Sequence, residues 1–348
     1  KSCLRRRLGE SSSLASSRYE MLTVVRQFAS EHLPADEQLA GLRQRYGRFY
    51  LGFIAEQQAA LQGSDQLRAL ASINLEIENI RQAWRFAVSQ EDITALDEAT
   101  AALSLYLYMR SWFREGLQLF SLAVLHLADC AAPWLLAKLK ARQGWFSYLS
   151  GDQQQAADLL SQSLESMPED GDPETMIYAL NFLAVVQYTQ EDFASAEAHC
   201  ERALAIAIAG GAQYSQAISN NILSQIAYQQ AQYERAQQFS QQSLALEQEL
   251  GNRWSMGFSL VNLGRVAAAL GDFETAKKHF EDSLAIRKGM GDARGQGLCH
   301  LYLGDTAVAR QDFAEAADQF QQSLAIFRQI GDQATTEKVN GRLAALPL

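Results

Sequence analysis

The sequence repeats itself every 40 residues through most of its length, and this period constrains the fold more than any other feature. The segment "GDFETAKKHFEDSLAI" at 271–286 has a counterpart 40 residues later, "QDFAEAADQFQQSLAI". Five units align without insertions. The aligned columns are Asp152, Asp192, Gln232, Asp272 and Asp312; Ala156, Ala196, Ala236, Ala276 and Ala316; Leu164, Leu204, Leu244, Leu284 and Leu324; and Gly144, Ala184, Ser224, Gly264 and Gly304. A period of this length predicts an array of stacked, similar units.

Each unit reads as two helices, because its apolar residues fall at helical spacing, as at Leu260, Leu263 and Val266. The dipeptide Gly271-Asp272 separates the two helices, since Gly tolerates a left-handed helix end and Asp caps the next helix. Small residues such as Gly264 let helix axes approach to about 8 Å. One helix pair cannot bury its own apolar face, so the units should stack into a solenoid.

This pattern resembles the tetratricopeptide repeat. The family's Leu-Gly in the first helix appears as "NLG" at 262–264 and "YLG" at 302–304. Its turn, aromatic residue, Ala and second aromatic residue appear as Gly271-Asp272-Phe273, Ala276 and Phe280. The period of 40 is longer than the family's usual 34, and Gly-Asp replaces its Pro. Such large repeats resemble those of bacterial signalling ATPases and transcription regulators, and the resemblance implies a right-handed, all-α solenoid.

The first residues do not follow the repeat. The segments "KSCL" at 1–4, "GESSSLASS" at 9–17 and "RYEMLTVVRQFASEHL" at 18–33 resemble the first strand, the wing, and the second strand with its helix in a winged-helix domain. That domain occurs in signal-transduction ATPases with numerous domains, the STAND class. The resemblance implies four regions: 1–33, the end of a winged-helix domain; 34–133, linker helices and degenerate repeats; 134–332, five repeats; and 333–348, a C-terminal cap.

In STAND proteins a nucleotide-binding module lies upstream of these regions, and the repeats form a sensor arm that holds the ATPase closed or releases it. We therefore expect the chain to be part of a longer bacterial polypeptide, with ATP or ADP and Mg bound by the upstream domain and an intramolecular contact between that domain and this arm. No "GxxxxGK[ST]" phosphate loop occurs in the chain, so we expect this part to bind no cofactor.

Composition supports a cytoplasmic protein that binds neither a membrane nor nucleic acid. No apolar run approaches the roughly 20 residues that span a bilayer. Residues 1–50 carry a net charge of +4 and the rest −14, which makes the body of the chain a poor polyanion binder. We read the "RRR" run at 5–7 as a solvated strand edge or an interdomain contact rather than a nucleic-acid contact.

The sequence gives no sign of an enzyme. Nucleophile-elbow, zinc HExxH and CxxC motifs do not occur. The four cysteines, Cys3, Cys130, Cys200 and Cys299, are scattered, so we expect them to be reduced and buried or half-buried rather than disulfide-bonded. The pairs His199-Cys200 and Cys299-His300 invite a metal interpretation, but a structural role is favoured.

We expect ligands to bind the concave face, which the first helix of each unit lines in the resembled family. The predicted binding residues are Trp145, Tyr148, Asn181, Tyr188, Asn221, Gln225, Tyr228, Arg265 and Asp305, and the same rows contain Ala141, Val185, Val261, Ala268, Leu301 and Val308. The alternative is that the tyrosines at 148, 188 and 228 only pack between adjacent units.

Two functions stay open on this reading. The chain is a sensor and autoinhibitory arm of a STAND regulator, responding to a protein, a peptide or a small-ligand trigger. Alternatively, it is a general protein-interaction scaffold unrelated to nucleotide switching.

Overall fold

A computed structural model describes residues 4–7, 18–21, 37–129, 132–167 and 171–347. The chain divides into two compact units, Lys1–Tyr46 and Gly47–Leu348, and the boundary falls within helix α2. In the first unit, strands β1 (Leu4–Arg7) and β2 (Arg18–Met21) pair antiparallel, with Leu4 opposite Met21. The first strand was expected at 1–4, and the described strand begins only at the last of these residues. The predicted wing and the helix after the second strand lie outside the described residues, so the winged-helix assignment stays a prediction.

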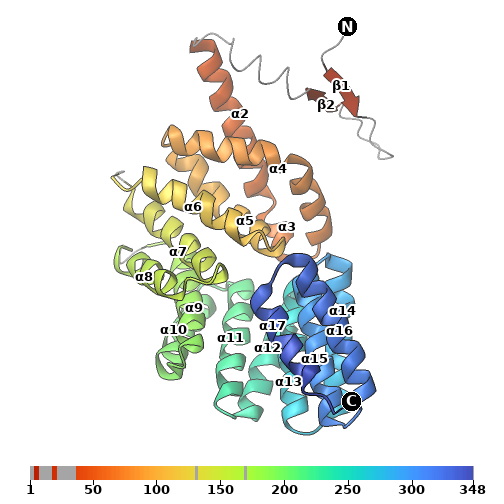
Figure 1. Ribbon diagram of the computed structural model, residues 1–348. Helices are drawn as coiled ribbons and strands as arrows, with labels where there is room; N and C mark the ends of the chain where they lie inside the picture. The colour runs from red at the N-terminus through yellow and green to blue at the C-terminus, as the bar shows by residue number, and fades with distance from the viewer. Residues whose placement is uncertain (1–3, 8–17, 22–36, 130–131, 168–170, 348) are drawn as a thin grey trace. The chain divides into compact units, whose positions relative to one another are not determined.

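The second unit is helical throughout its described residues, as the repeat predicts, and its successive helices stack side by side (Figure 1). The N-terminal helices are α2 (Glu37–Glu56), α3 (Gln58–Gln62), α4 (Gln66–Ser89), α5 (Ile93–Met109) and α6 (Phe113–His126). The five predicted units are the pairs α7 (Pro133–Leu149) and α8 (Gln153–Glu165), α9 (Pro173–Thr189) and α10 (Phe193–Ala209), α11 (Gln213–Gln229) and α12 (Tyr233–Leu250), α13 (Arg253–Ala269) and α14 (Phe273–Met290), and α15 (Ala293–Ala309) and α16 (Phe313–Ile330). A last helix, α17 (Gln333–Ala344), buries Val339 against α16.

The turn inside each unit is built as expected, with one addition. The Asp272 carboxylate accepts a hydrogen bond from the Thr275 amide, and the aspartates of the other units do the same, whereas Gln232 makes no such cap. The residue before the cap adopts a positive φ not only at Gly271 but also at non-glycine residues. These are Glu191, Ala231 and Gln311. Since this conformation is unfavourable for side chains with a Cβ, packing of the helix pair must hold the turn there.

The two helices of a unit meet at the small-residue column. A Cβ added to Gly264 would lie 2.6 Å from the Phe280 ring, so the glycine makes room for that buried ring. The residues that face each other at this contact are complementary in size. When the residue of the second helix is smaller than phenylalanine or leucine, the residue of the first helix is larger than glycine. The pairs are Gly144 with Leu160, Ala184 with Cys200, Ser224 with Ser240, Gly264 with Phe280, and Gly304 with Phe320.

A column of buried serines also links the two helices of a unit. The Ser283 hydroxyl donates a 2.8 Å hydrogen bond to the carbonyl of Gly257, 26 residues earlier. The same bond recurs from Ser163 to Ala137, from Ser243 to Ala217 and from Ser323 to Gly297. Each carbonyl belongs to a first helix, so these bonds fix the axial register of the pair.

Two helix corners that are far apart in sequence contact each other within the helical array. The buried Gln66 side chain donates a 2.8 Å hydrogen bond to Asn252 and accepts a 3.0 Å bond from the Trp254 amide. A Cβ on Gly251 would lie 2.9 Å from Ser64, so the two corners fit closely. We call this contact the 66–252 junction. It joins the α3–α4 corner to the α12–α13 corner, across 186 residues.

Candidate ligand-binding surface

The structure places three of the predicted residues, one arginine and two tyrosines, around a third tyrosine that was not predicted, Tyr302. The Arg265 guanidinium lies 4.1 Å from the centre of the Tyr228 ring and 5.8 Å from that of Tyr302. Tyr188 lies close enough to Tyr302 to affect its pKa, which desolvation raises most and Arg265 lowers. All four side chains are half-buried and come from α9, α11, α13 and α15. Successive first helices therefore share one surface here.

The tyrosine column also packs within its own units. Tyr188 makes an edge contact with Phe193, and the Tyr228 and Tyr233 rings lie 5.6 Å apart. Burial raises the pKa of Tyr148. The Tyr188 and Tyr228 rings thus each contact the second helix of their unit and remain partly accessible, which suits both packing and binding.

Trp145, which we predicted to bind a ligand, is almost fully buried. Its ring is 5% exposed and stacks on Phe182 at 3.9 Å and on Tyr148 at 5.2 Å. It also meets Tyr108 edge-on, and Tyr108 in turn meets Trp254 at 5.0 Å. Trp145 therefore belongs to an aromatic cluster that connects α5, α7, α9 and α13.

The two predicted asparagines already have partners inside the protein. The side-chain oxygen Oδ1 of Asn181 accepts hydrogen bonds from Ser219 at 3.0 Å and Cys200 at 3.4 Å. The Asn221 amide group donates to the Glu247 carboxylate of its own unit at 3.0 Å, and its side-chain oxygen accepts 3.1 Å hydrogen bonds from Ser259 and Asn262 of the next unit. Both asparagines are buried, so their amides connect neighbouring units as well as lying on the predicted rows.

Glu247 is a buried acid at the centre of this polar network. Its carboxylate also accepts hydrogen bonds from Ser259 at 2.6 Å and Ser243 at 3.2 Å. Desolvation raises the pKa of Glu247 to about 7, opposed by these hydrogen bonds and by the charge of Arg287. The repeat pattern did not indicate Glu247, because the equivalent position differs in the other units, where it is occupied by residues such as Ala207, Arg287 and Phe327.

The remaining predicted residues lie apart from this group. The Gln225 amide donates to the carbonyl of Asn221 at 3.4 Å. Asp305 forms a 3.4 Å ion pair with Arg342 of α17, and desolvation raises its pKa. Val308 is exposed, whereas Ala141 and Leu301 are buried. The predicted rows therefore run from the core to the surface rather than along one accessible face.

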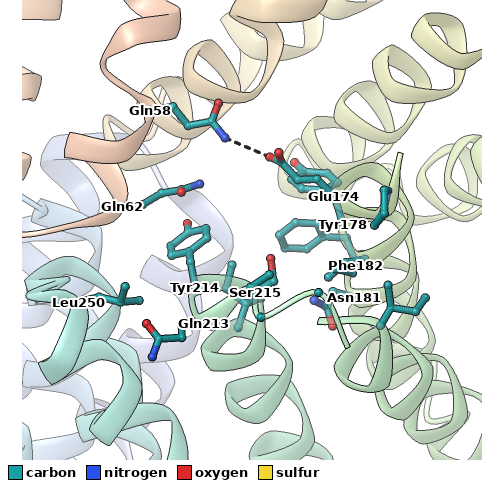
Figure 2. A pocket seen from close by; sticks show the side chains of 17 residues that line it. Gln58, Gln62, Glu174, Tyr178, Asn181, Phe182, Gln213, Tyr214, Ser215 and Leu250 are labelled. Atoms are coloured by element: carbon teal, nitrogen blue, oxygen red, sulfur yellow. Dashed lines mark hydrogen bonds between the residues drawn. The ribbon is translucent and has the colours of Figure 1, made fainter. Parts of the chain in front are cut away.

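A pocket of about 510 Å³ lies between α3, α9, α11 and the end of α12. Figure 2 shows Tyr214 and Gln62 on one side of it and Tyr178, Phe182 and Glu174 on the other. Sequence reasoning included only Asn181 of its lining residues. It missed the three aromatic rings because they lie at positions that the family pattern does not mark, and only Tyr178 and Tyr214 share a sequence signal, an aromatic residue in the first half of a first helix.

The pocket wall carries one ionisable acid and no basic side chain. Glu174 is 46% exposed and accepts a 3.2 Å hydrogen bond from Gln58 through Oε1. The buried Arg142 reaches the same oxygen only at 4.0 Å, and its guanidinium lies 3.3 Å from the centre of the Tyr178 ring. Burial raises the pKa of both Tyr178 and Tyr214, so these phenols stay neutral.

The described residues hold no group of three or more His, Cys, Asp or Glu side chains that could bind a metal ion. His199 and His300 each hydrogen-bond to a glutamine, Gln187 and Gln319. Cys200 and Cys299 are free and buried, as predicted, while Cys3 and Cys130 lie outside the described residues. In the part of the chain that the structure describes, no helix is long and apolar enough to cross a membrane.

Comparison with protein families identifies the repeats. Residues 175–249 and 255–329 match the family model for the tetratricopeptide repeat. These two segments are tetratricopeptide repeats. They include four of the predicted helix pairs almost entirely, and such repeats form scaffolds for interaction with other proteins. No curated protein sequence matches the chain.

Solved structures share the fold at low sequence identity. A STAND protein with a tetratricopeptide repeat sensor from Pyrococcus horikoshii is 13% identical, with a TM-score of 0.61, over 94% of this chain and 46% of that one. This chain thus spans less than half of the STAND protein's length. A Rap protein complexed with competence and sporulation factor is also 13% identical, with a TM-score of 0.57, over 87% of this chain and 98% of that one. A third is a chain in the structure of the APC/C hetero-tetramer Cut9-Hcn1, which is 13% identical, with a TM-score of 0.53, over 82% of this chain and 54% of that one.

Proposed function

We propose that this chain is the sensor and autoinhibitory arm of a bacterial, cytoplasmic STAND regulator, and that it recognises a protein or peptide trigger on its inner surface. The observation that carries the proposal is the likeness to a STAND protein over 94% of this chain, which extends well beyond the matched repeats. The resemblance of residues 1–33 to the end of a winged-helix domain supports the same reading. A small-ligand trigger is the alternative that the pocket allows.

The upstream sequence tests the regulatory part of this proposal. We expect a "GxxxxGK[ST]" motif after a strand within roughly 300 residues upstream, the length of one or two domains. A reading frame that contains no such motif in that interval would refute the STAND assignment and leave the general scaffold as the function.

The surface formed by Tyr188, Tyr228, Arg265 and Tyr302 is where we place the trigger, because four first helices present half-buried aromatic groups and one cation there. Half-buried aromatic residues and arginine are the side chains that most often dominate protein interfaces. The experiment is selection of a random peptide library on this chain, followed by affinity measurements on variants. Tyr188→Ala and Tyr228→Ala should each weaken a selected peptide roughly 5- to 100-fold, corresponding to about 1–3 kcal/mol.

Gln241→Ala, on an exposed position of α12, is the matched control and should leave affinity unchanged. Arg265→Glu should weaken acidic peptides most, and by a smaller factor at high salt, because screening reduces the charge contribution. Selected peptides that bind all of these variants equally would place the trigger elsewhere on the array.

A further inference from the structure

The charge on the wall of the pocket between α3, α9 and α11 indicates which kind of ligand side chain it could bind. Glu174 is the only lining residue with a charged side chain, and its Oε2 has no hydrogen-bond partner among the described residues. Ligand atoms entering the pocket would meet this oxygen as the one formal charge on the wall. The wall therefore favours a cation over an anion.

The aromatic residues of the pocket also favour a cationic ligand, and they can pack against an alkyl chain next to its charged group. The Tyr214 ring has no aromatic or cationic partner among the described residues, and it lies across the pocket from Tyr178 and Phe182 (Figure 2). Aromatic faces attract ammonium and guanidinium groups and pack against alkyl chains. The protein already uses this chemistry once in the same wall, where Arg142 lies on the Tyr178 ring.

The charge of Arg142 offsets part of the Glu174 charge from behind the pocket wall, but a ligand would contact the carboxylate and not the guanidinium. Arg142 is 2% exposed and is not among the residues that line the pocket. Its closest approach to Glu174 is 4.0 Å, at the oxygen that Gln58 also contacts. The other carboxylate oxygen remains available to a ligand.

The start of α11 adds groups that suit a peptide main chain. At the cap position, Ala212 stands where Asn252 and Asp292 cap later units, so no side chain accepts a hydrogen bond from the first amides of α11. Residues 210–215 line the pocket, together with the Gln62 amide of α3. The Gln213 backbone amide donates to the Gly211 carbonyl at 3.0 Å, so among the described residues the unpaired amides at this helix start are those of Tyr214 and Ser215. Unpaired amide donors beside a side-chain pocket can pair with carbonyl oxygens of an extended segment.

We propose that this pocket binds the side chain of a lysine or arginine in a partner peptide, with its charged end at Glu174 and its alkyl stem between Tyr214 and the pair Tyr178 and Phe182. The inference rests on the proposed function, because it assumes a peptide or protein trigger. It adds the identity of one residue that the trigger must contain. Together with Arg265, it describes a partner with a basic residue at one point and acidic residues at another.

Four blocked tripeptides test the inference, acetyl-Ala-Xaa-Ala-amide with lysine, arginine, norleucine or glutamate as Xaa, titrated into the whole chain and followed by NMR. Lysine and arginine peptides should bind about 3- to 10-fold more tightly than norleucine, the range expected for a partly exposed charge pair. The glutamate peptide should bind most weakly.

Glu174→Gln should remove the preference for lysine over norleucine while leaving norleucine binding unchanged. Tyr214→Ala should weaken all peptides together, because it removes packing area. Glu281→Gln, which removes an exposed carboxylate on α14, is the matched charge control and should behave as wild type. Circular dichroism melting curves of each variant verify that the helices are intact.

Equal binding of lysine and norleucine by the wild type, tightest binding of glutamate, or no binding of any peptide would each overturn the inference. These results leave the proposed function standing if library-selected peptides still depend on Tyr188 and Tyr228. The opposite outcome is also distinguishable. If the library selection yields no peptide that depends on Tyr188 and Tyr228, but lysine tripeptides still bind more tightly than norleucine through Glu174, the proposed trigger site on the inner surface is refuted and the proposed lysine or arginine site in the pocket stands.

Discussion

The contact between Gly264 and Phe280 offers the sharpest test of how the helix pairs hold together. A Cβ at position 264 would lie 2.6, 2.8 and 2.9 Å from three atoms of the Phe280 ring, which is 1% exposed. The ring cannot move away without displacing its buried neighbours. Gly264→Ala should therefore lower the free energy of unfolding by about 1–3 kcal/mol through overpacking, and Gly264→Leu by at least as much.

The protein contains its own compensated version of this contact, in which Ala184 faces Cys200. Phe280→Cys alone should cost about 3–5 kcal/mol, because a large buried ring is lost. The double variant Gly264→Ala with Phe280→Cys should cost less than the sum of the two, with a coupling of about 1–2 kcal/mol. The assay is urea unfolding followed by circular dichroism, with Gln241→Ala as an exposed control within about 0.5 kcal/mol. Strict additivity, or equal midpoints for Gly264→Ala and Gln241→Ala, would refute the packing argument.

Further predictions concern buried polar groups and nucleotide. Ser283→Ala should cost about 1 kcal/mol in urea unfolding, because the Gly257 carbonyl loses its bond from the serine. Folding raises the pKa of Glu247 from near 4.5 to about 7, so the stability it contributes is complete below pH 4.5 and falls as pH rises toward 7. Across that window the free energy of unfolding should fall by about 1–3 kcal/mol, and Glu247→Gln should flatten this part of the curve; a wild-type curve of the same shape as the variant would contradict it. Isothermal titration with ATP or ADP should give no heat, because the sequence has no phosphate loop, and micromolar binding would contradict the sensor-only reading.

The repeat alone predicts most of the helical architecture. Apolar spacing gives the helix pairs, the Gly-Asp dipeptides give their turns, and the small-residue column gives the contact at Gly264. These features depend on local conformation and on nearest-neighbour packing, both of which recur with the period. The positive φ at Glu191 was not predictable, because a residue type that disfavours this conformation is held there by the surrounding helices.

The repeat pattern could not predict the pocket. Its wall combines α3, which does not follow the repeat, with helices more than 100 residues away, as in the bond between Gln58 and Glu174. A periodic pattern describes what each unit has in common, whereas this site depends on residues that differ between units, such as Tyr214 and Ala212. The predicted rows contained the asparagines and the tyrosines but could not indicate that the side-chain oxygens of Asn181 and Asn221 already accept hydrogen bonds from the next unit.

The 66–252 junction changes how such an array should unfold. Helical arrays whose units contact only their neighbours can fray from either end, one unit after another. Here the α3–α4 corner and the α12–α13 corner hold each other, so the segment between them is tied at both ends. Bringing these corners together carries the entropy cost of closing a long loop, so we expect the junction to form late in folding. Amide hydrogen exchange should then divide the chain, with α15–α17 opening independently and the helices between the two corners exchanging together in a single cooperative event.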